Sequence, residues 1–274
     1  MISTHYEDLQ QGNRFDFGAN WNEFLNSLNE TRIIEAEKSL KEMLKVENLE
    51  GQTFLDIGSG SGLFSLAAKR LGAKVHSFDY DPKSVQCTLE LKRRYFENDD
   101  NWQVEEGSAL DLSYVETLGK FDIVYSWGVL HHTGNMYQAL QNALIPLKEK
   151  GKLFIAIYND QHFTSKVWLK VKKFYCLGPL GKALMCCFFF PLFATQGILL
   201  SLARHKNLQG YFQSYKETRG MSVYHDWIDW LGGLPFEVAS PEAIFNFYVK
   251  QGLSLSNLIT TNSLACNQFV FERG

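Results

Sequence analysis

The chain has 274 residues, of which 45% are hydrophobic and 21% charged, and its formal net charge is −3. This composition is typical of a packed globular protein, and the weakly acidic balance argues against nucleic acid as the main partner. The first residues show neither a basic n-region nor an apolar h-region, so no secretory signal is expected.

The five cysteines do not form a metal-binding pattern. Cys87, Cys176 and Cys266 are isolated, Cys186 and Cys187 are adjacent within an apolar run, and none has C-x-x-C spacing. We therefore expect a reducing compartment, the cytoplasm, and no metal site.

The apolar spacing predicts a helix over 21–45, and from residue 53 onward it alternates between strands and helices. Strands separated by helices of about 10–15 residues predict a parallel, doubly wound α/β sheet. Asp81 followed by Pro82 predicts a helix N-cap. The expected strands cover 53–58, 74–79, 102–107, 121–128 and 151–159, and the helices between them cover 61–72, 81–96 and 134–147.

The alternation stops after Asn159 and resumes with a helix over 240–252, for which Ser240 is the expected N-cap. Strands over 253–260 and 266–273 follow, and the short loop between them predicts a hairpin with an antiparallel last strand. Three parts are expected: an N-terminal lid and helix over 1–50, a sheet domain over 51–160 and 238–274, and a helical cap or substrate insertion over 161–237.

The most informative stretch is FLDIGSGSG, in which the first expected strand runs into a turn. Glycines at 58, 60 and 62 permit a tight turn and a close approach of the backbone to a ligand. The spacing differs from the dinucleotide fingerprint G-x-G-x-x-G, and the preceding Asp56 would repel a pyrophosphate. Asp79 ends the second strand, where an acid accepts hydrogen bonds from ribose hydroxyls. A nucleoside that carries a cationic amino acid and no phosphate fits this pattern, and S-adenosylmethionine is such a molecule.

These residues make the chain resemble the class I S-adenosylmethionine-dependent methyltransferases over 53–160 and 240–272. The resemblance implies S-adenosylmethionine as the cofactor and a seven-stranded sheet of order 3-2-1-4-5-7-6 with strand 7 antiparallel. In that family the glycine loop and the acid before it hold the methionyl part, and the acid after strand 2 holds the ribose. The residues that the resemblance places at the cofactor are Asp56, Gly58, Ser59, Gly60, Gly62, Asp79, Tyr80, Ser108, Ala109 and Leu110.

Two further segments bear on the cofactor. The segment after strand 3 frames adenine in that family, often as Gly-Asp-Ala, and here it reads EGSALD with Ser108 in place of the acid. Asp111 or a backbone carbonyl is the alternative partner of the adenine amino group. YSWGVLHHTG, after strand 4, resembles the quinone-type small-molecule methyltransferases, whose equivalent loop faces the methyl group. Trp127, which ends strand 4, is expected to wall the cofactor.

Methyl transfer from a sulfonium is an in-line displacement that requires alignment of the reactants and exclusion of water. A general base is needed only where the acceptor atom holds a proton of high pKa. The candidate catalytic residues are His132 and Tyr158, near the ends of strands 4 and 5, and His225 in the insertion. Alternatively, His131 and His132 position their loop by hydrogen bonds, and YHDWIDW (224–230) is an amphipathic helix that packs on the sheet domain.

The N-terminal stretch RFDFGANW has a functional and a structural interpretation. Small methyltransferases often fold such a segment over the cofactor, with Phe15, Phe17 and Trp21 as the lid here and Asn20 bonded to the methionyl end. Alternatively, the stretch is a hydrophobic latch for the helix that follows it.

Three functions compete. The favoured one is methyl transfer to a small aromatic, quinone-like or apolar acceptor, with O- or C-transfer. The second is methylation of RNA or protein, for which Lys166, Lys170, Lys172 and Lys173 supply a basic face. The third is a nucleotide-binding oxidoreductase, against which Asp56 and the glycine spacing argue. A non-catalytic protein that binds the nucleoside as a sensor is a further alternative, because this chemistry has no compulsory catalytic residue.

ALMCCFFFPLFATQGILLSLA, residues 183–203, contains no charged residue. Its length suits a membrane span, but Pro191 interrupts it and both ends of the insertion return to one sheet domain. We expect two short apolar helices hinged near Pro191. They would cap the strand ends or form a homodimer surface, with peripheral membrane contact as the alternative to either.

Overall fold

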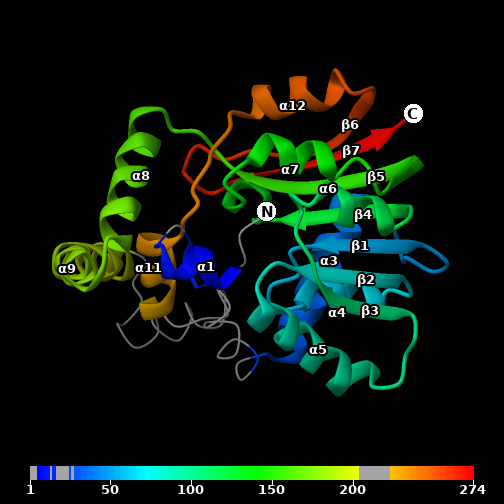
Figure 1. Ribbon diagram of the computed structural model, residues 1–274, viewed down its shortest axis with the longest axis horizontal. Helices are drawn as coiled ribbons and strands as arrows, with labels where there is room; N and C mark the ends of the chain where they lie inside the picture. The colour runs from blue at the N-terminus through cyan, green and yellow to red at the C-terminus, as the bar shows by residue number, and fades with distance from the viewer. Residues whose placement is uncertain (1–4, 13, 17–24, 26–27, 204–222) are drawn as a thin grey trace.

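A seven-stranded sheet forms the centre of the chain (Figure 1). The computed structural model describes all residues except 1–4, 13, 17–24, 26–27 and 204–222. The strand order is β3-β2-β1-β4-β5-β7-β6, and β7 is antiparallel to both β5 and β6, whereas the other pairs are parallel. The expected topology, including the closing hairpin, is confirmed.

The strands alternate with helices along the chain. The strands are β1 (Thr53–Ile57), β2 (Lys74–Asp79), β3 (Trp102–Glu106), β4 (Phe121–Trp127), β5 (Leu147–Tyr158), β6 (Leu253–Ile259) and β7 (Cys266–Arg273). The helices are α1 (His5–Gln10), α3 (Glu30–Leu44), α4 (Leu63–Arg70), α5 (Pro82–Phe96), α6 (Leu112–Thr117), η1 (Leu130–His132), α7 (Met136–Asn142), α8 (Phe163–Cys176), α9 (Pro179–Ala203), α11 (Val223–Gly232) and α12 (Pro241–Val249).

Helices cover both faces of the sheet, and each face has its own hydrophobic cluster. One cluster joins α3, α4 and α5 to the sheet through residues such as Leu40, Leu66 and Leu91. The other joins α7 and α12 to the opposite face through residues such as Leu140 and Tyr248. The central strands are therefore buried on both sides, which is why their sequences read as continuous apolar runs.

The predicted caps lie where the sequence places them. The Asp81 side chain accepts the Lys83 N–H at 2.9 Å, and the Ser240 hydroxyl accepts the Ala243 N–H at 3.2 Å. The prediction of one continuous helix over 21–45 is wrong, because Asn29 interrupts it; residues 21–24 lie outside the described residues. α3 begins at Glu30, because Asn29 is extended and its side chain accepts the Arg32 N–H at 3.1 Å.

The prediction of two apolar helices hinged at Pro191 is also wrong. α9 is one helix of 25 residues that continues through Pro191. A proline removes one intrahelical hydrogen bond, but packing on both sides of it sustains the helix. Phe189 lies 5.3 Å from the Trp168 ring of α8, and Phe193 lies 5.6 Å from the Trp227 ring of α11, both between ring centroids.

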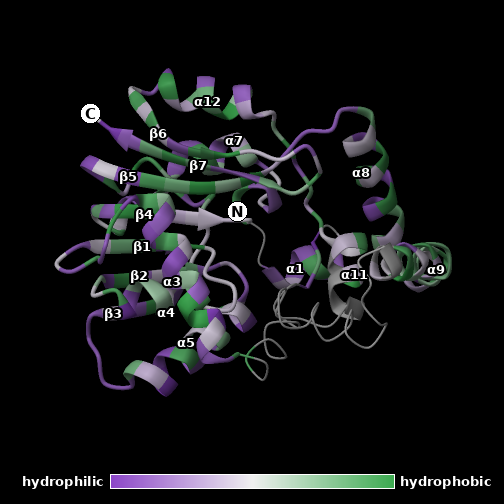
Figure 2. Ribbon diagram, turned by 180° about the vertical axis from the view of Figure 1, so that it is seen from behind, coloured by the Kyte–Doolittle hydropathy of each residue, from purple (hydrophilic) through white to green (hydrophobic). Residues whose placement is uncertain are grey.

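α9 lies on the far side of α8 and α11 from the strand ends (Figures 1 and 2). It is therefore the outer layer of the insertion and does not itself cap the sheet. Its stretch Pro179–Leu199 is long and apolar enough to cross a membrane, judged by length and composition alone.

The α3 interface allows a test of the core. Leu40 is fully buried and Ile34, on the same helix, is 48% exposed. Leu40→Ala should lower the free energy of unfolding by about 2–5 kcal/mol, because it leaves a cavity against the sheet. Ile34→Ala should lower it by less than about 1 kcal/mol. Equal losses in urea unfolding would contradict the placement of α3.

Candidate functional site

The loop after β1 depends on glycine. Gly58, Gly60 and Gly62 have positive φ angles of 78°, 55° and 80°. The Gly58 N–H donates to the Phe78 carbonyl at 2.8 Å, which fixes the loop against the end of β2. A Cβ atom on Gly58 would lie 2.3 Å from a Val129 methyl carbon, so this loop touches the loop that follows β4.

Asp79 joins the loops that follow β1 and β2. Its Oδ2 accepts the Gly60 N–H and its Oδ1 accepts the Asp81 N–H, both at 2.9 Å. Burial raises the pKa of Asp79 to about 6, although these two hydrogen bonds oppose the rise. Each carboxylate oxygen has a second lone pair, so the group can also accept hydrogen bonds from a diol. This geometry suits the predicted ribose contact.

Asp56 is buried in a chain of polar groups. Its Oδ2 accepts the Ser65 hydroxyl at 2.5 Å, Ser65 bonds to the Ser77 hydroxyl at 2.7 Å, and the Trp102 indole N–H donates to Ser77 at 3.0 Å. Burial, and secondarily the charge of Asp79, raise the pKa of Asp56 to about 7. A cationic ligand nearby would favour the ionised carboxylate. The two acids therefore fit a ligand with an ammonium group and a ribose.

The segment after β3 uses its polar side chains to shape its own turn. The Ser108 hydroxyl accepts the Leu110 N–H at 3.2 Å, and Asp111 caps α6 by accepting the Tyr114 N–H at 3.2 Å. The Ala109 carbonyl accepts the Asn142 side chain at 2.8 Å. The adenine contacts expected of Ser108, Ala109, Leu110 or Asp111 stay predictions.

A second group of residues, which we call the aromatic–histidine cluster, lies where β4 and β5 end. The Tyr158 ring centroid is 4.0 Å from that of His131, 5.3 Å from that of His132, 5.6 Å from that of Phe236 and 6.1 Å from that of Trp230. The structure thus brings together His132 and Tyr158, two of the predicted catalytic residues. The third, His225, lies in α11, and its side chain is outside the described part of the chain.

His132 is neutral in this environment. Its Nδ1 lies 2.5 Å from the Pro235 carbonyl, and because a carbonyl only accepts, Nδ1 carries the hydrogen and Nε2 does not. Burial lowers the pKa of His132 to about 3. Such a group accepts a hydrogen bond more readily than it takes up a proton, so a base role for His132 stays a prediction.

Arg14 links the end of β2 to the aromatic–histidine cluster. It is not among the site residues that the sequence predicts. Its guanidinium lies 4.9 Å from the Tyr80 ring centroid at the end of β2, and its Nη1 donates to the His132 carbonyl at 3.2 Å. Tyr80 in turn donates to Asp8 of α1 at 3.2 Å. The described part of the N-terminal segment therefore lies across the carboxyl ends of the strands, which we call the ligand edge because ligands of such sheets bind there. This placement supports the lid interpretation. Phe17, Asn20 and Trp21 lie outside the described residues.

Lys172 corrects the predicted basic face. It is 1% exposed, donates to the Trp230 carbonyl, and lies 4.7 Å from the Trp230 ring centroid. The exposed lysines of α8 are the other three of that set. The helical spacing of Lys172 indicates its burial, because Lys172 falls four residues after Trp168 and three before the buried Tyr175.

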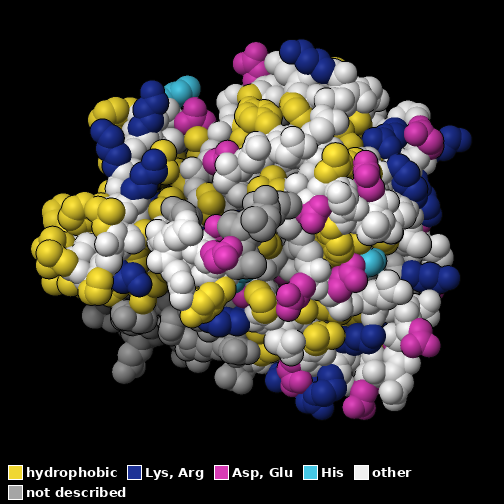
Figure 3. Space-filling view, in the orientation of Figure 1, with side chains coloured by type: hydrophobic (Ala, Val, Ile, Leu, Met, Phe, Trp, Pro, Cys, Tyr) yellow, Lys and Arg dark blue, Asp and Glu magenta, His cyan; other side chains and the backbone are white. Residues whose placement is uncertain are grey.

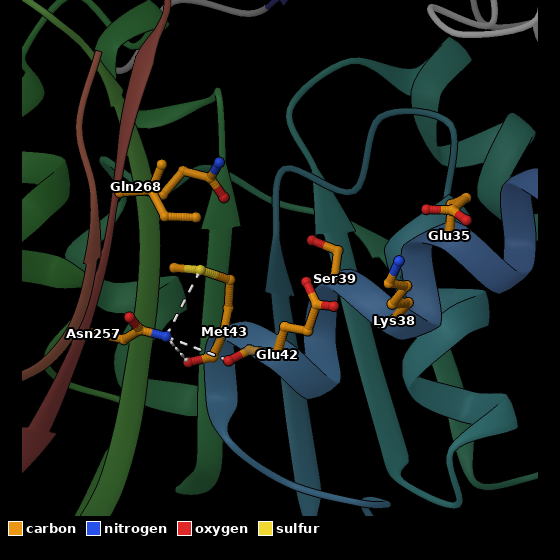
Figure 4. Close-up of a pocket in the computed structure, with 8 residues that line it drawn as sticks. Glu35, Lys38, Ser39, Glu42, Met43, Asn257 and Gln268 are labelled. Carbon is orange, nitrogen blue, oxygen red and sulfur yellow. Dashed lines mark hydrogen bonds between the residues drawn. The ribbon is translucent and has the colours of Figure 1, made fainter.

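A separate groove lies between α3 and the β6–β7 hairpin (Figure 4). It is lined by Glu35, Lys38, Ser39, Glu42, Met43, Asn257, Ile259 and Gln268, and by no residue of the glycine loop. The Trp127 indole donates to Gln268 at 3.2 Å, so this side chain reaches toward β7. Its expected role as a wall of the cofactor site stays a prediction.

The comparison with known families decides the identity of this arrangement. The model of the methyltransferase domain family matches residues 48–187, which include the glycine loop, both acids and the loop after β4. The chain belongs to this methyltransferase family. It is a class I member by its sheet, and S-adenosylmethionine is the cofactor of that class.

Individual relatives are distant. Ribosomal protein L11 methyltransferase from Bacillus cereus is 30% identical over 121 residues, or 39% of this chain, and the chain spans only 38% of that relative. Magnesium protoporphyrin IX methyltransferase from Synechocystis PCC 6803 superposes with a TM-score of 0.53 at 13% identity, covering 90% of this chain and 89% of the other. A methyltransferase from Aquifex aeolicus gives 0.51 at 15%, covering 94% and 99%. At these identities the structural likeness concerns the fold alone.

Gly58 allows a matched test of the loop. Gly58→Ala adds a Cβ that meets Val129, whereas Gly119→Ala, at a similar φ of 81°, meets nothing within 4 Å. Both variants carry backbone strain of about 1–3 kcal/mol, but only Gly58→Ala displaces the ligand loop. In calorimetric titration it should lose at least about tenfold in S-adenosylhomocysteine affinity. An equal loss of S-adenosylhomocysteine affinity in both variants would show that backbone strain, and not displacement of the loop, causes the loss.

Asp56 predicts a pH dependence of stability. Its folded pKa of about 7 lies above its ordinary value, so the folded state holds the proton more tightly. This contribution is complete at pH values below about 4 and is lost as pH rises through 7. The free energy of unfolding of the ligand-free protein should therefore fall less between pH 5 and about 8 in Asp56→Asn than in the wild type. If urea unfolding showed the same fall in the free energy of unfolding with pH in both proteins, the raised pKa of Asp56 would be contradicted.

Proposed function

We propose that the chain transfers a methyl group from S-adenosylmethionine to a small aromatic or apolar acceptor held at the aromatic–histidine cluster. One observation carries the proposal: the glycine loop and the cluster meet at one edge of the sheet. Gly58 touches Val129, which is two residues before His131. Ligands of doubly wound sheets bind at the carboxyl ends of the strands, where both groups lie.

The residues present fit the cofactor. Positive φ angles at three glycines give the loop a tight turn beside the strand ends, Asp79 has lone pairs for the ribose hydroxyls, and Asp56 is the buried acid that a cationic amino acid would keep ionised. Positioning of the methionyl part is therefore assigned to Asp56 and the glycine loop, and of the ribose to Asp79. Arg14 holds the N-terminal segment over Tyr80 and closes this edge.

The cofactor supplies an electrophilic methyl group, and the chain has to orient the acceptor and keep water away. Tyr158, Trp230 and Phe236 supply flat apolar surfaces on which a planar acceptor can stack. His132, unprotonated at Nε2, can accept a hydrogen bond from an acceptor hydroxyl and so orient its oxygen. This arrangement favours O-transfer, with C-transfer requiring only the stacking surfaces.

A protein acceptor is the second candidate, because relatives that match part of this chain are named for methylation of a ribosomal protein. A peptide side chain would enter from outside, whereas Phe236 and His131 are only 6% and 0% exposed. The small-molecule proposal therefore rests on the enclosed cluster, and the protein alternative on the name of the relatives.

The test uses Tyr158→Ala, which removes the stacking ring, with the 47% exposed Tyr137→Ala as its matched control. First, a thermal-shift screen with S-adenosylhomocysteine should identify an acceptor among small aromatic compounds. Tyr158→Ala should then lower kcat/KM for that acceptor by about tenfold or more, because the acceptor loses a stacking surface, with S-adenosylhomocysteine affinity within about twofold. Tyr137→Ala should change neither.

Two results would overturn the proposal. Absence of S-adenosylhomocysteine binding to the folded protein would remove the cofactor assignment. Methylation of protein substrates, with no shift from any small aromatic compound, would favour the second candidate instead.

A further inference from the structure

α9 presents an apolar face that no described part of the chain covers. Its side chains at Leu180, Leu184, Phe188 and Leu192 follow one another at intervals of four, so they form a stripe along one side of the helix. Their exposed fractions run from 49% to 74%, and Leu199 continues the stripe at 61%. Of the 18 most apolar consecutive residues of the helix, only 6% are buried. Exposed apolar surfaces of this continuity mark interaction sites.

The opposite side of α9 is already used. Phe189 and Phe193 pack on Trp168 of α8, and Phe190 and Phe193 pack on Trp227 of α11. A helix that is apolar all round is expected to be covered all round. Among the described residues, α9 meets this condition on one side only, so we look for a second apolar environment for its stripe.

The surroundings of the stripe are basic. Lys166, Lys170 and Lys173 occupy successive turns of α8 and line a shallow groove with the apolar Phe163, Val167 and Leu169. Lys182, near the start of α9, is also exposed. No aspartate or glutamate occurs between residues 163 and 203. Figure 3 shows the dark blue side chains over α8 beside the yellow surface of α9.

We infer that α9 and α8 dock the protein on an anionic lipid surface, with α9 lying in the plane of the interface. The stripe enters the boundary of the acyl chains, and the three α8 lysines and Lys182 lie at the level of the phosphate headgroups. This assignment rests on the surface chemistry alone and does not depend on the proposed methyl transfer.

Two other occupants fit the surface less well. A transmembrane orientation would carry α8 and α11 into the hydrocarbon, because both pack on α9, and the charged lysines of α8 are strongly disfavoured there. A two-fold dimer through the stripe would bring the lysines of both copies to the same interface, where like charges repel. Anionic headgroups complement the same lysines.

Flotation with lipid vesicles tests the inference on the full chain. Binding is expected to phosphatidylcholine vesicles that contain about one third phosphatidylglycerol, and to weaken at least about tenfold in pure phosphatidylcholine or when salt rises from about 0.1 to 0.5 M. Phe188→Ser with Leu192→Ser should weaken binding to the anionic vesicles at least about tenfold. The matched control is Ile34→Ser with Leu112→Ser, two helical side chains that are 48% and 47% exposed, and it should bind like the wild type.

A charge variant keeps the test independent of folding. Lys166→Gln, Lys170→Gln and Lys173→Gln together alter only exposed side chains, and should also lower binding to anionic vesicles at least about tenfold. Absence of binding to both vesicle types would overturn the inference. Equal binding to anionic and to pure phosphatidylcholine vesicles would also overturn it. A dimer in sedimentation velocity that Phe188→Ser with Leu192→Ser dissociates, without vesicle binding, would identify a second copy as the occupant.

Discussion

The contact between Gly58 and Val129 is the constraint on which the ligand edge depends. With φ at 78° and no room for a Cβ atom, Gly58 lets the loop after β1 press directly on the loop after β4. The Gly60 N–H bond to Asp79 extends the same alignment to β2. Three loops that are remote in sequence are thereby held together, and both the residues proposed to bind the cofactor and the aromatic–histidine cluster take their positions from these loops.

The two buried carboxyl groups at the ligand edge are electrostatically unfavourable when no ligand is bound. Burial raises the pKa of both Asp56 and Asp79, and the negative charge of Asp79 raises the pKa of Asp56 further. The chain compensates in part with backbone N–H groups on Asp79 and a serine hydroxyl on Asp56. A cationic cofactor would supply the remaining compensation, so the stability lost in building the site is recovered as affinity for a ligand of that charge.

The insertion connects the edge to the outer surface through aromatic contacts. Tyr158 touches Trp230, Trp230 lies 5.2 Å from Trp168 between ring centroids, and Trp168 packs on the inner side of α9. Lys172 is buried beside Trp230 and satisfies its carbonyl, which ties α8 to α11. The apolar run of α9 therefore supports the aromatic–histidine cluster from outside, and no described residue covers its outer face.

The sequence predicts those features that are encoded locally, and the structure adds those that depend on contacts between remote residues. Alternating apolar runs predict the strands, the Asp81–Pro82 and Ser240–Pro241 pairs predict helix starts, and the spaced glycines with two acids predict the cofactor loop. The start of α3 is set by the Asn29 cap within a longer apolar pattern, and the continuity of α9 through Pro191 is set by packing on α8 and α11. Arg14 gains its role from Tyr80 and His132, neither of which its local sequence indicates.

A crystal structure with S-adenosylhomocysteine bound tests the central claim most directly, because it locates each part of the ligand. The account predicts the amino group near Asp56, the ribose hydroxyls on the Asp79 carboxylate, and the sulfur facing Tyr158 and His132. A ligand bound in the groove between α3 and the β6–β7 hairpin, or with its sulfur turned away from the aromatic–histidine cluster, would contradict it.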